Sequence, residues 1–107
     1  DNLKKKTNIF DREGDRTTMR AIVTVVAKDR VGIIATVCNL LAKYRVNVLD
    51  ISQTVMQDYF TMIMMVDATE CELPIAQLIQ VMKEEGLKQE LDIHVQREDI
   101  FNAMHRI

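Results

Sequence analysis

The sequence predicts an α+β domain in which two helices cover one face of a four-stranded antiparallel sheet. Its hydrophobic periodicity changes along the chain in the order strand, helix, strand, strand, helix, strand. The two central strands are separated only by Gln57-Asp58, which is short enough for a hairpin. With right-handed crossovers this order gives the ferredoxin-like βαββαβ arrangement, whose usual strand order is 4-1-3-2.

The first strand and the first helix are predicted from a change in apolar spacing. Residues 20–27 are rich in valine and isoleucine and precede the charged Lys28-Asp29-Arg30, which is typical of a strand that ends in a turn. Residues 31–44 are predicted to be a helix, because their apolar side chains recur every three or four positions and form one wide stripe. The stripe consists of Ile33, Ile34, Val37, Cys38, Leu41 and Tyr44.

The remaining elements follow from turn and breaker residues. Residues 46–57 and 59–67 are expected to form the central hairpin. A second helix is expected from Pro74, which a first helical turn tolerates, to Gly86, which is expected to stop it. Residues 87–96 alternate between apolar and polar side chains and are the fourth predicted strand. Its apolar side is Leu91, Ile93 and Val95.

Both faces of the first and third predicted strands are apolar. A sheet face exposed to water normally carries polar side chains, so we expect the face without the two helices to be covered. Residues 99–107 are predicted to form an extra C-terminal helix, with Glu98 and Asp99 near its start and His105-Arg106 at its end, as the helix dipole favours. We expect this helix to cover the second face of its own subunit or of a dimer partner. Its apolar stripe is Ile100, Ala103, Met104 and Ile107, with Phe101 beside it.

The first 18 residues differ in composition from the remainder. They contain few large apolar side chains and cannot form a core, whereas Met19 opens the compact apolar pattern. Residues 1–18 are therefore expected to be a leader or an added segment, and residues 19–107 a single domain.

Composition excludes several classes of function. Lys and Arg number 14 against 16 Asp and Glu, so the net charge of -2 gives no general attraction for nucleic acid. No 18-residue apolar run or N-terminal apolar block points to a membrane or to secretion. Cys38 and Cys71 are expected to be free thiols, and the cytoplasm is the expected location.

The connection between the first strand and the first helix is the candidate site. Gly32 lies where the first helical N–H groups have no intrahelical partner, and its missing side chain would let a carboxylate approach them. Asp29 is the alternative cap for these groups. Asn47 would place an amide near the far end of the same helix. From the residues alone, a structural explanation stays open: Gly32 allows close helix–sheet packing, and Asn47 ends a helix.

Other functions of this fold lack their characteristic residues. RNA recognition on such a sheet needs exposed aromatic and basic side chains, but the central strands offer only Tyr59 and Phe60. A metal chaperone would need a Cys-x-x-Cys motif, which the sequence lacks. A hydrolytic enzyme is disfavoured because the turn has no phosphate-binding glycine cluster, and Ser52 is the only serine. No catalytic residue, metal ligand or cofactor is therefore expected.

The stretch KDRVGIIATVCNLLAKYRVNVLDIS, residues 28–52, resembles the opening motif of ACT domains. In that motif an Asp/Asn-Arg-x-Gly-Val/Ile turn precedes an apolar helix, and an Asn-Ile/Val pair opens the second strand. The resemblance extends from residue 20 to about residue 96. Residues 19–107, including the final REDIFNAMHRI, are further similar to the small stand-alone ACT proteins of bacteria and archaea.

This resemblance implies a regulatory or sensor module without catalysis of its own. It implies a homodimer that binds a small-molecule effector, expected to be an amino acid, at an interface between domains. Val31 stands where proline is frequent in the family, and Ala27 where some members place a ligand-contacting histidine. The alternative is a structural oligomerisation module with a vestigial ligand turn. The positions that match the family's ligand contacts are Asp29, Arg30, Val31, Gly32, Ile33 and Asn47.

Overall fold

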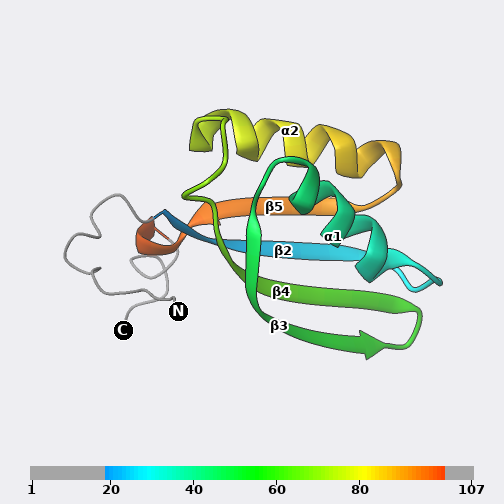
Figure 1. The fold of residues 1–107 in the computed structure, drawn as a ribbon. Helices are drawn as coiled ribbons and strands as arrows, with labels where there is room; N and C mark the ends of the chain where they lie inside the picture. Colours follow the sequence, from blue (N-terminus) through cyan, green and yellow to red (C-terminus); the bar gives the residue numbers. More distant parts are fainter. Residues whose placement is uncertain (1–18, 101–107) are drawn as a thin grey trace.

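The structure is a computed structural model and describes residues 19–100. Its elements in chain order are β2 (Arg20–Lys28), α1 (Ile33–Lys43), β3 (Asn47–Met56), β4 (Tyr59–Asp67), α2 (Ile75–Lys88) and β5 (Asp92–Arg97) (Figure 1). The sheet order is β3-β4-β2-β5, and every neighbouring pair is antiparallel. This order is the predicted 4-1-3-2 arrangement counted from the opposite edge, so the predicted fold is confirmed.

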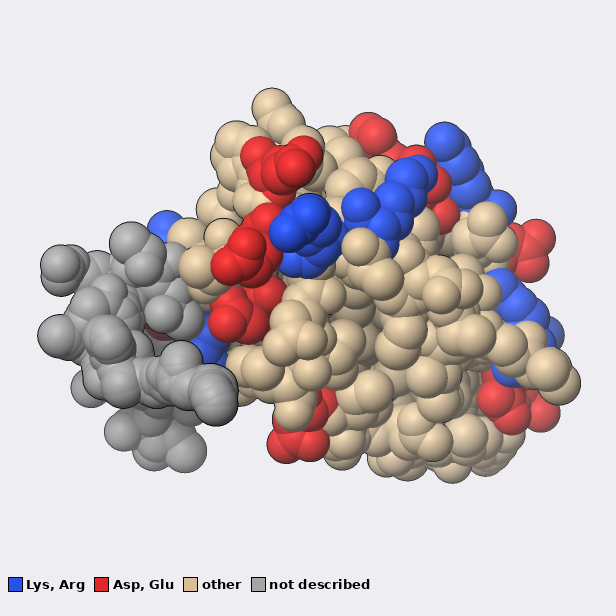
Figure 2. Space-filling view, in the orientation of Figure 1, with Lys and Arg blue, Asp and Glu red and all other residues tan. Residues whose placement is uncertain are grey.

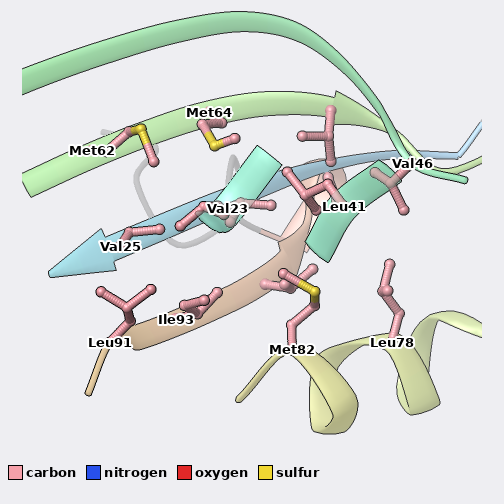
Figure 3. Packing of buried hydrophobic residues seen from close by; sticks show 14 of the residues in the cluster. Val23, Val25, Leu41, Val46, Met62, Met64, Leu78, Met82, Leu91 and Ile93 are labelled. Carbon is pink, nitrogen blue, oxygen red and sulfur yellow. The ribbon is translucent and has the colours of Figure 1, made fainter. Parts of the chain in front are cut away.

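The hydrophobic core lies between the sheet and the two helices. Along β2, alternate residues such as Val23 and Val25 are fully buried against the helix layer, as period-two side-chain alternation requires. The helices contribute Leu41 from α1 and Met82 from α2, which face the sheet residues in Figure 3. No polar or charged side chain among residues 19–100 is buried. Packing of apolar surface therefore dominates the stability of this part of the chain.

Helix α1 is shorter than the predicted 31–44 and is bounded by two left-handed residues. It starts at Ile33 because Gly32, with φ of 92°, is its N-cap. Its end is closed by hydrogen bonds from the Val46 N–H to the Leu41 carbonyl, at 2.9 Å, and from the Arg45 N–H to the Ala42 carbonyl, at 3.0 Å. This is a Schellman-type ending, which turns the chain back toward β3.

Gly86 does not end the second helix, so that prediction was wrong. Helix α2 continues to Lys88, and Gly86 is buried inside it. A Cβ atom at this position would lie 2.8 Å from the Ile93 side chain and 2.9 Å from the Leu91 carbonyl oxygen. Gly86 therefore allows β5 to pack closely against α2. Because residues 87 and 88 belong to α2, the last strand starts at Asp92 rather than at residue 87.

The sheet face without helices carries apolar side chains, as predicted, but Thr24 and Thr61 alternate with them in its centre. Its side chains include Ile22 and Val26 of β2 and Ile63 and Met65 of β4, and Ile63 is 45% exposed. The chain becomes helical again at residues 98–100. Most of the predicted C-terminal helix, and the predicted leader at residues 1–18, lie outside the described residues. Cys38 and Cys71 are both free, as predicted, and no helix within residues 19–100 is long and apolar enough to cross a membrane.

Candidate functional site

The turn between β2 and α1 leaves the first helical N–H groups without a side-chain cap. The backbone of Gly32 adopts φ 92° and ψ 3°, a left-handed conformation that L-residues rarely adopt. No side chain caps the helix, and its first turn contains no acidic residue. Asp29 is therefore not the cap, and the positive end of the helix dipole is available to an anion.

Gly32 does not serve close packing within the subunit. A Cβ atom built on it meets no atom within 4 Å, so the space beside it is open. The close-packing explanation of this glycine was therefore wrong, because the left-handed backbone requires it instead. The open space is nevertheless compatible with a ligand approaching the N–H groups.

A pocket of about 270 Å³ lies beside this turn. It contains four of the six predicted site residues, together with helix residues of α1 and strand residues of β3 and β4. Drug-sized ligands usually occupy pockets of about 300–1,000 Å³, so this pocket suits a smaller molecule. Its lining consists of Asp29, Arg30, Gly32, Ile33, Ile34, Ala35, Gln53, Val55 and Phe60.

Two hydrogen bonds tie the turn to other elements. The Asp29 N–H donates to the Asp58 carbonyl in the β3–β4 turn at 2.8 Å. The Arg30 guanidinium donates to the Gln89 carbonyl beyond the end of α2. A cation there is favourable because the last carbonyls of a helix carry partial negative charge. Arg30 thus contributes to the pocket wall, but its charge already has a partner in the subunit.

The other two predicted residues do not line this pocket. Val31 is 100% exposed at the tip of the turn. Asn47 opens β3, opposite Asp67 of β4, at the other end of α1. Since α1 has 11 residues and rises about 1.5 Å per residue, about 16 Å separates the two ends. Within one subunit, therefore, Asn47 and Gly32 do not form a common site.

Sequence analysis missed the strand residues of the pocket, namely Gln53 and Val55 of β3 and Phe60 of β4. They reach it because β3 returns antiparallel to α1, so the end of β3 passes beside the start of the helix. One signal was present in the sequence. Gln53 is a polar residue at a position whose neighbours in the alternation, Ile51 and Val55, are apolar. This break in the apolar alternation is the only mark of Gln53 in the sequence, and an exposed polar side chain is by itself ordinary.

Strand β3 is an edge strand with an unpaired backbone side next to the pocket. The pair Met56–Tyr59 closes a two-residue turn, so the backbone N–H and C=O groups of Met56 point toward β4. The backbone groups of every second residue, counted back from Val55, therefore point away from β4 to the open edge. The outward set is Ile51, Gln53 and Val55. Consistent with this, the Ile51 N–H donates to the Asp50 carboxylate at 2.9 Å rather than to β4.

The surface around α1 and β3 carries almost no charge. Helix α1 has no charged residue before Lys43, and β3 has only Asp50. Figure 2 shows a continuous area without charged side chains over α1 and the adjoining strand. By contrast α2 carries Lys83, Glu84, Glu85 and Lys88. Within residues 19–100 no three His, Cys, Asp or Glu side chains cluster as metal ligands would.

The chain is similar to known proteins over most of its described residues. A family model for the ACT domain matches residues 20–96. A UPF0237 protein of Clostridium perfringens is 54% identical over 89 residues, which are 83% of this chain and all of the relative. A UPF0237 protein of the archaeon Methanosarcina mazei is 46% identical over 91 residues, which are 85% of this chain and 99% of that protein. The ACT domain protein from Streptococcus pneumoniae superposes with a TM-score of 0.70 at 38% identity, covering 81% of this chain and 98% of that one.

Proposed function

Because this chain belongs to the ACT domain family, and within it to the small UPF0237 proteins of bacteria and archaea, we propose that it binds a free amino acid and acts as a regulatory module without catalysis of its own. ACT domains are typically small-molecule-binding regulatory modules. The observation that carries the proposal is the uncapped N-terminus of α1, which opens into a pocket that also contains a carboxylate, Asp29.

The chemistry of this pocket suits a zwitterion. The carboxylate of an amino acid would accept hydrogen bonds from the first N–H groups of α1, where the dipole favours negative charge. Its ammonium group would pair with Asp29, and the Gln53 amide offers both a donor and an acceptor. Val55 and Phe60 supply an apolar wall for the side chain. A dianion such as a phosphate would instead be repelled by Asp29.

The proposed functional unit is a homodimer that pairs the β3 edges of two subunits. An edge strand with exposed apolar side chains and without proline readily pairs with another strand. The uncharged face of α1 lies beside the same edge and would be buried with it. The charged helix α2 belongs on the solvent side of such a dimer. Isologous twofold pairing is the commonest arrangement of soluble homo-oligomers.

This pairing would also account for Asn47. In an antiparallel twofold pairing centred on Ile51, residue 47 of one strand lies within one position of residue 55 of the other, because the β-bulge between residues 48 and 50 inserts one residue. The partner subunit's Asn47 would then stand beside Val55, which lines the pocket. The site would therefore be incomplete in one subunit, and ligand binding would strengthen the dimer by linkage.

A thermal-shift panel of the twenty amino acids tests the proposal. A ligand at a hundredfold its dissociation constant adds about 2.7 kcal/mol of stability. For a domain of this size that corresponds to a rise in Tm of about 10 °C or more. Asp29→Asn should abolish most of this shift, because it removes the charge that pairs with the ammonium group. The matched control is Asp50→Asn, which neutralises a carboxylate on the other sheet face and should retain the wild-type shift.

The alternative function is a structural oligomerisation module with a vestigial ligand turn. It is favoured by the fully exposed Val31, which contributes nothing to the pocket and resembles a contact residue. A flat thermal-shift panel for a protein that still dimerises would support this alternative and refute amino-acid binding. A shift that is unchanged in Asp29→Asn would instead show that the ligand binds elsewhere.

A further inference from the structure

The pocket beside the β2–α1 turn differs in chemistry between its two ends. Asp29 lies at the end nearest the β3–β4 turn, because its N–H donates to the Asp58 carbonyl. Gln53 lies toward the opposite end, two residues before Val55 on β3, which is about 7 Å by the rise of a strand. Between these ends Val55 and Phe60, which are paired across the hairpin, form an apolar wall. A ligand in this pocket therefore meets a carboxylate, an apolar patch and an amide in that order.

Two polar side chains of the pocket have no partner in the described part of the chain. Within residues 19–100 neither the Asp29 carboxylate nor the Gln53 amide takes part in a hydrogen bond or ion pair, and both side chains are exposed. The Arg30 guanidinium, by contrast, already donates to the Gln89 carbonyl. The described lining thus offers a free carboxylate and a free amide, whereas its one cation is engaged.

We propose that this pocket selects neutral amino acids whose side chains carry a hydrogen-bonding group, such as threonine or asparagine, and that Gln53 determines this preference. The inference rests on the amino-acid binding proposed above. With the ammonium group on Asp29 and the carboxylate on the first N–H groups of α1, the ligand side chain extends over Val55 toward Gln53. The Gln53 amide has both donors and an acceptor, so it bonds a hydroxyl group or another amide.

The charges of the pocket disfavour ionised side chains. A side-chain carboxylate would share the pocket with Asp29, and Arg30 would have to leave the Gln89 carbonyl to compensate the second negative charge. A cationic side chain would find no second carboxylate in the lining once Asp29 pairs with the ammonium group. The volume of about 270 Å³ further favours a short side chain.

Isothermal titration calorimetry with isosteric amino acids tests this preference, because each pair differs in one functional group. The pairs are threonine with valine, asparagine with leucine, and asparagine with aspartate. The wild-type protein should bind threonine about fivefold more tightly than valine, and asparagine about fivefold more tightly than leucine, as one additional hydrogen bond predicts. Aspartate should bind about tenfold more weakly than asparagine, or weaker still, because of repulsion by Asp29.

The variant Gln53→Met tests the role of Gln53, because methionine has the same length but lacks the amide. This variant should lose the preference for threonine over valine and for asparagine over leucine. The matched control Gln77→Met makes the same substitution at an exposed residue of α2 outside the pocket, and should retain both preferences. Both variants should still disfavour aspartate, because Asp29 is unchanged. Circular dichroism checks that both variants remain folded.

The outcomes separate this inference from the proposed function. Equal affinities within the threonine and asparagine pairs, or preferences retained in Gln53→Met, would overturn the inference and leave amino-acid binding intact. Tighter binding of aspartate than of asparagine would also overturn it, because a cation would then be free in the pocket. If none of these amino acids binds although another raises the Tm in the thermal-shift panel, only this inference fails. A flat panel refutes both.

Discussion

Replacing Gly86 with alanine should destabilise the fold, although alanine is the better helix former. In an open helix position Gly→Ala contributes about 1 kcal/mol of stability. Here the new Cβ would lie 2.8 Å from Cγ1 and Cδ1 of Ile93 and 2.9 Å from the Leu91 carbonyl oxygen. The carbonyl belongs to backbone that is held in place by the 2.8 Å hydrogen bond from the Leu91 N–H to the Gly86 carbonyl, so it cannot retreat freely.

The magnitude follows from these opposing terms. Overpacking of a core costs about 1–3 kcal/mol, and the rigid oxygen contact places this site at the upper end. Subtracting the helix-propensity gain leaves a loss of about 2 kcal/mol in the free energy of unfolding. Urea unfolding followed by circular dichroism should show this as a midpoint about 1 M lower, since m-values of small domains are about 1–3 kcal/mol/M.

A double-mutant cycle with Ile93→Val separates crowding from other effects. Ile93→Val alone costs about 0.5–1.5 kcal/mol because it leaves a cavity. In the Gly86→Ala protein it removes the Cδ1 contact, so its cost should fall by about 0.5–1 kcal/mol. Gly32→Ala is the control, because its cost comes from a positive φ without any crowding and should simply add to that of Ile93→Val. Stabilisation by Gly86→Ala, or strict additivity with Ile93→Val, would refute this reasoning.

Three further outcomes are expected. Ile51→Lys should shift the proposed dimer to a 12.4 kDa species in sedimentation velocity, because two like charges would meet at the twofold axis. The control variant Val26→Lys, at a residue of similar exposure on the other sheet face, should remain dimeric. Dissociation of both variants would argue against the β3 interface. Gly32→Val should abolish amino-acid binding by calorimetry while circular dichroism shows a folded protein, and retained affinity would remove the ligand from this turn. Arg45→Gly should raise the free energy of unfolding, measured by urea, by about 1 kcal/mol, because Arg45 has φ of 63° at a helix end that favours glycine. An unchanged unfolding midpoint would show that this conformation costs nothing here.

The sequence was sufficient for the fold because local signals and global order agree. The valine-rich run of β2, the apolar stripe of α1 and the short turn at Gln57-Asp58 each specify an element independently of the others. Gly86 was misinterpreted because glycine has two uses, ending a helix or admitting a neighbour. Only the position of Ile93, seven residues later in sequence and 2.8 Å away in space, distinguishes them.

The candidate site was predicted in part. The turn residues Asp29, Arg30, Gly32 and Ile33 are contiguous, so a motif places them together. Gln53 and Val55 depend on how far β3 runs back along α1, and a register shift by a β-bulge at residues 48–50 changes which side each residue faces. Periodicity alone does not locate such a bulge. The pocket wall therefore could not be read from spacing.

The two apolar surfaces of the sheet have different requirements for burial. The β3 edge presents unpaired backbone groups, and only another strand satisfies these in register, which favours a second copy of the same edge. The helix-free face presents side chains rather than backbone groups, so its burial needs only side-chain contact. Ile51 belongs to the β3 edge and also lines a hollow beside Met65 on the helix-free face, so the two surfaces meet at this residue. A charge at Ile51 should therefore disturb both surfaces, and the responses to Ile51→Lys and Met65→Asp should not be additive.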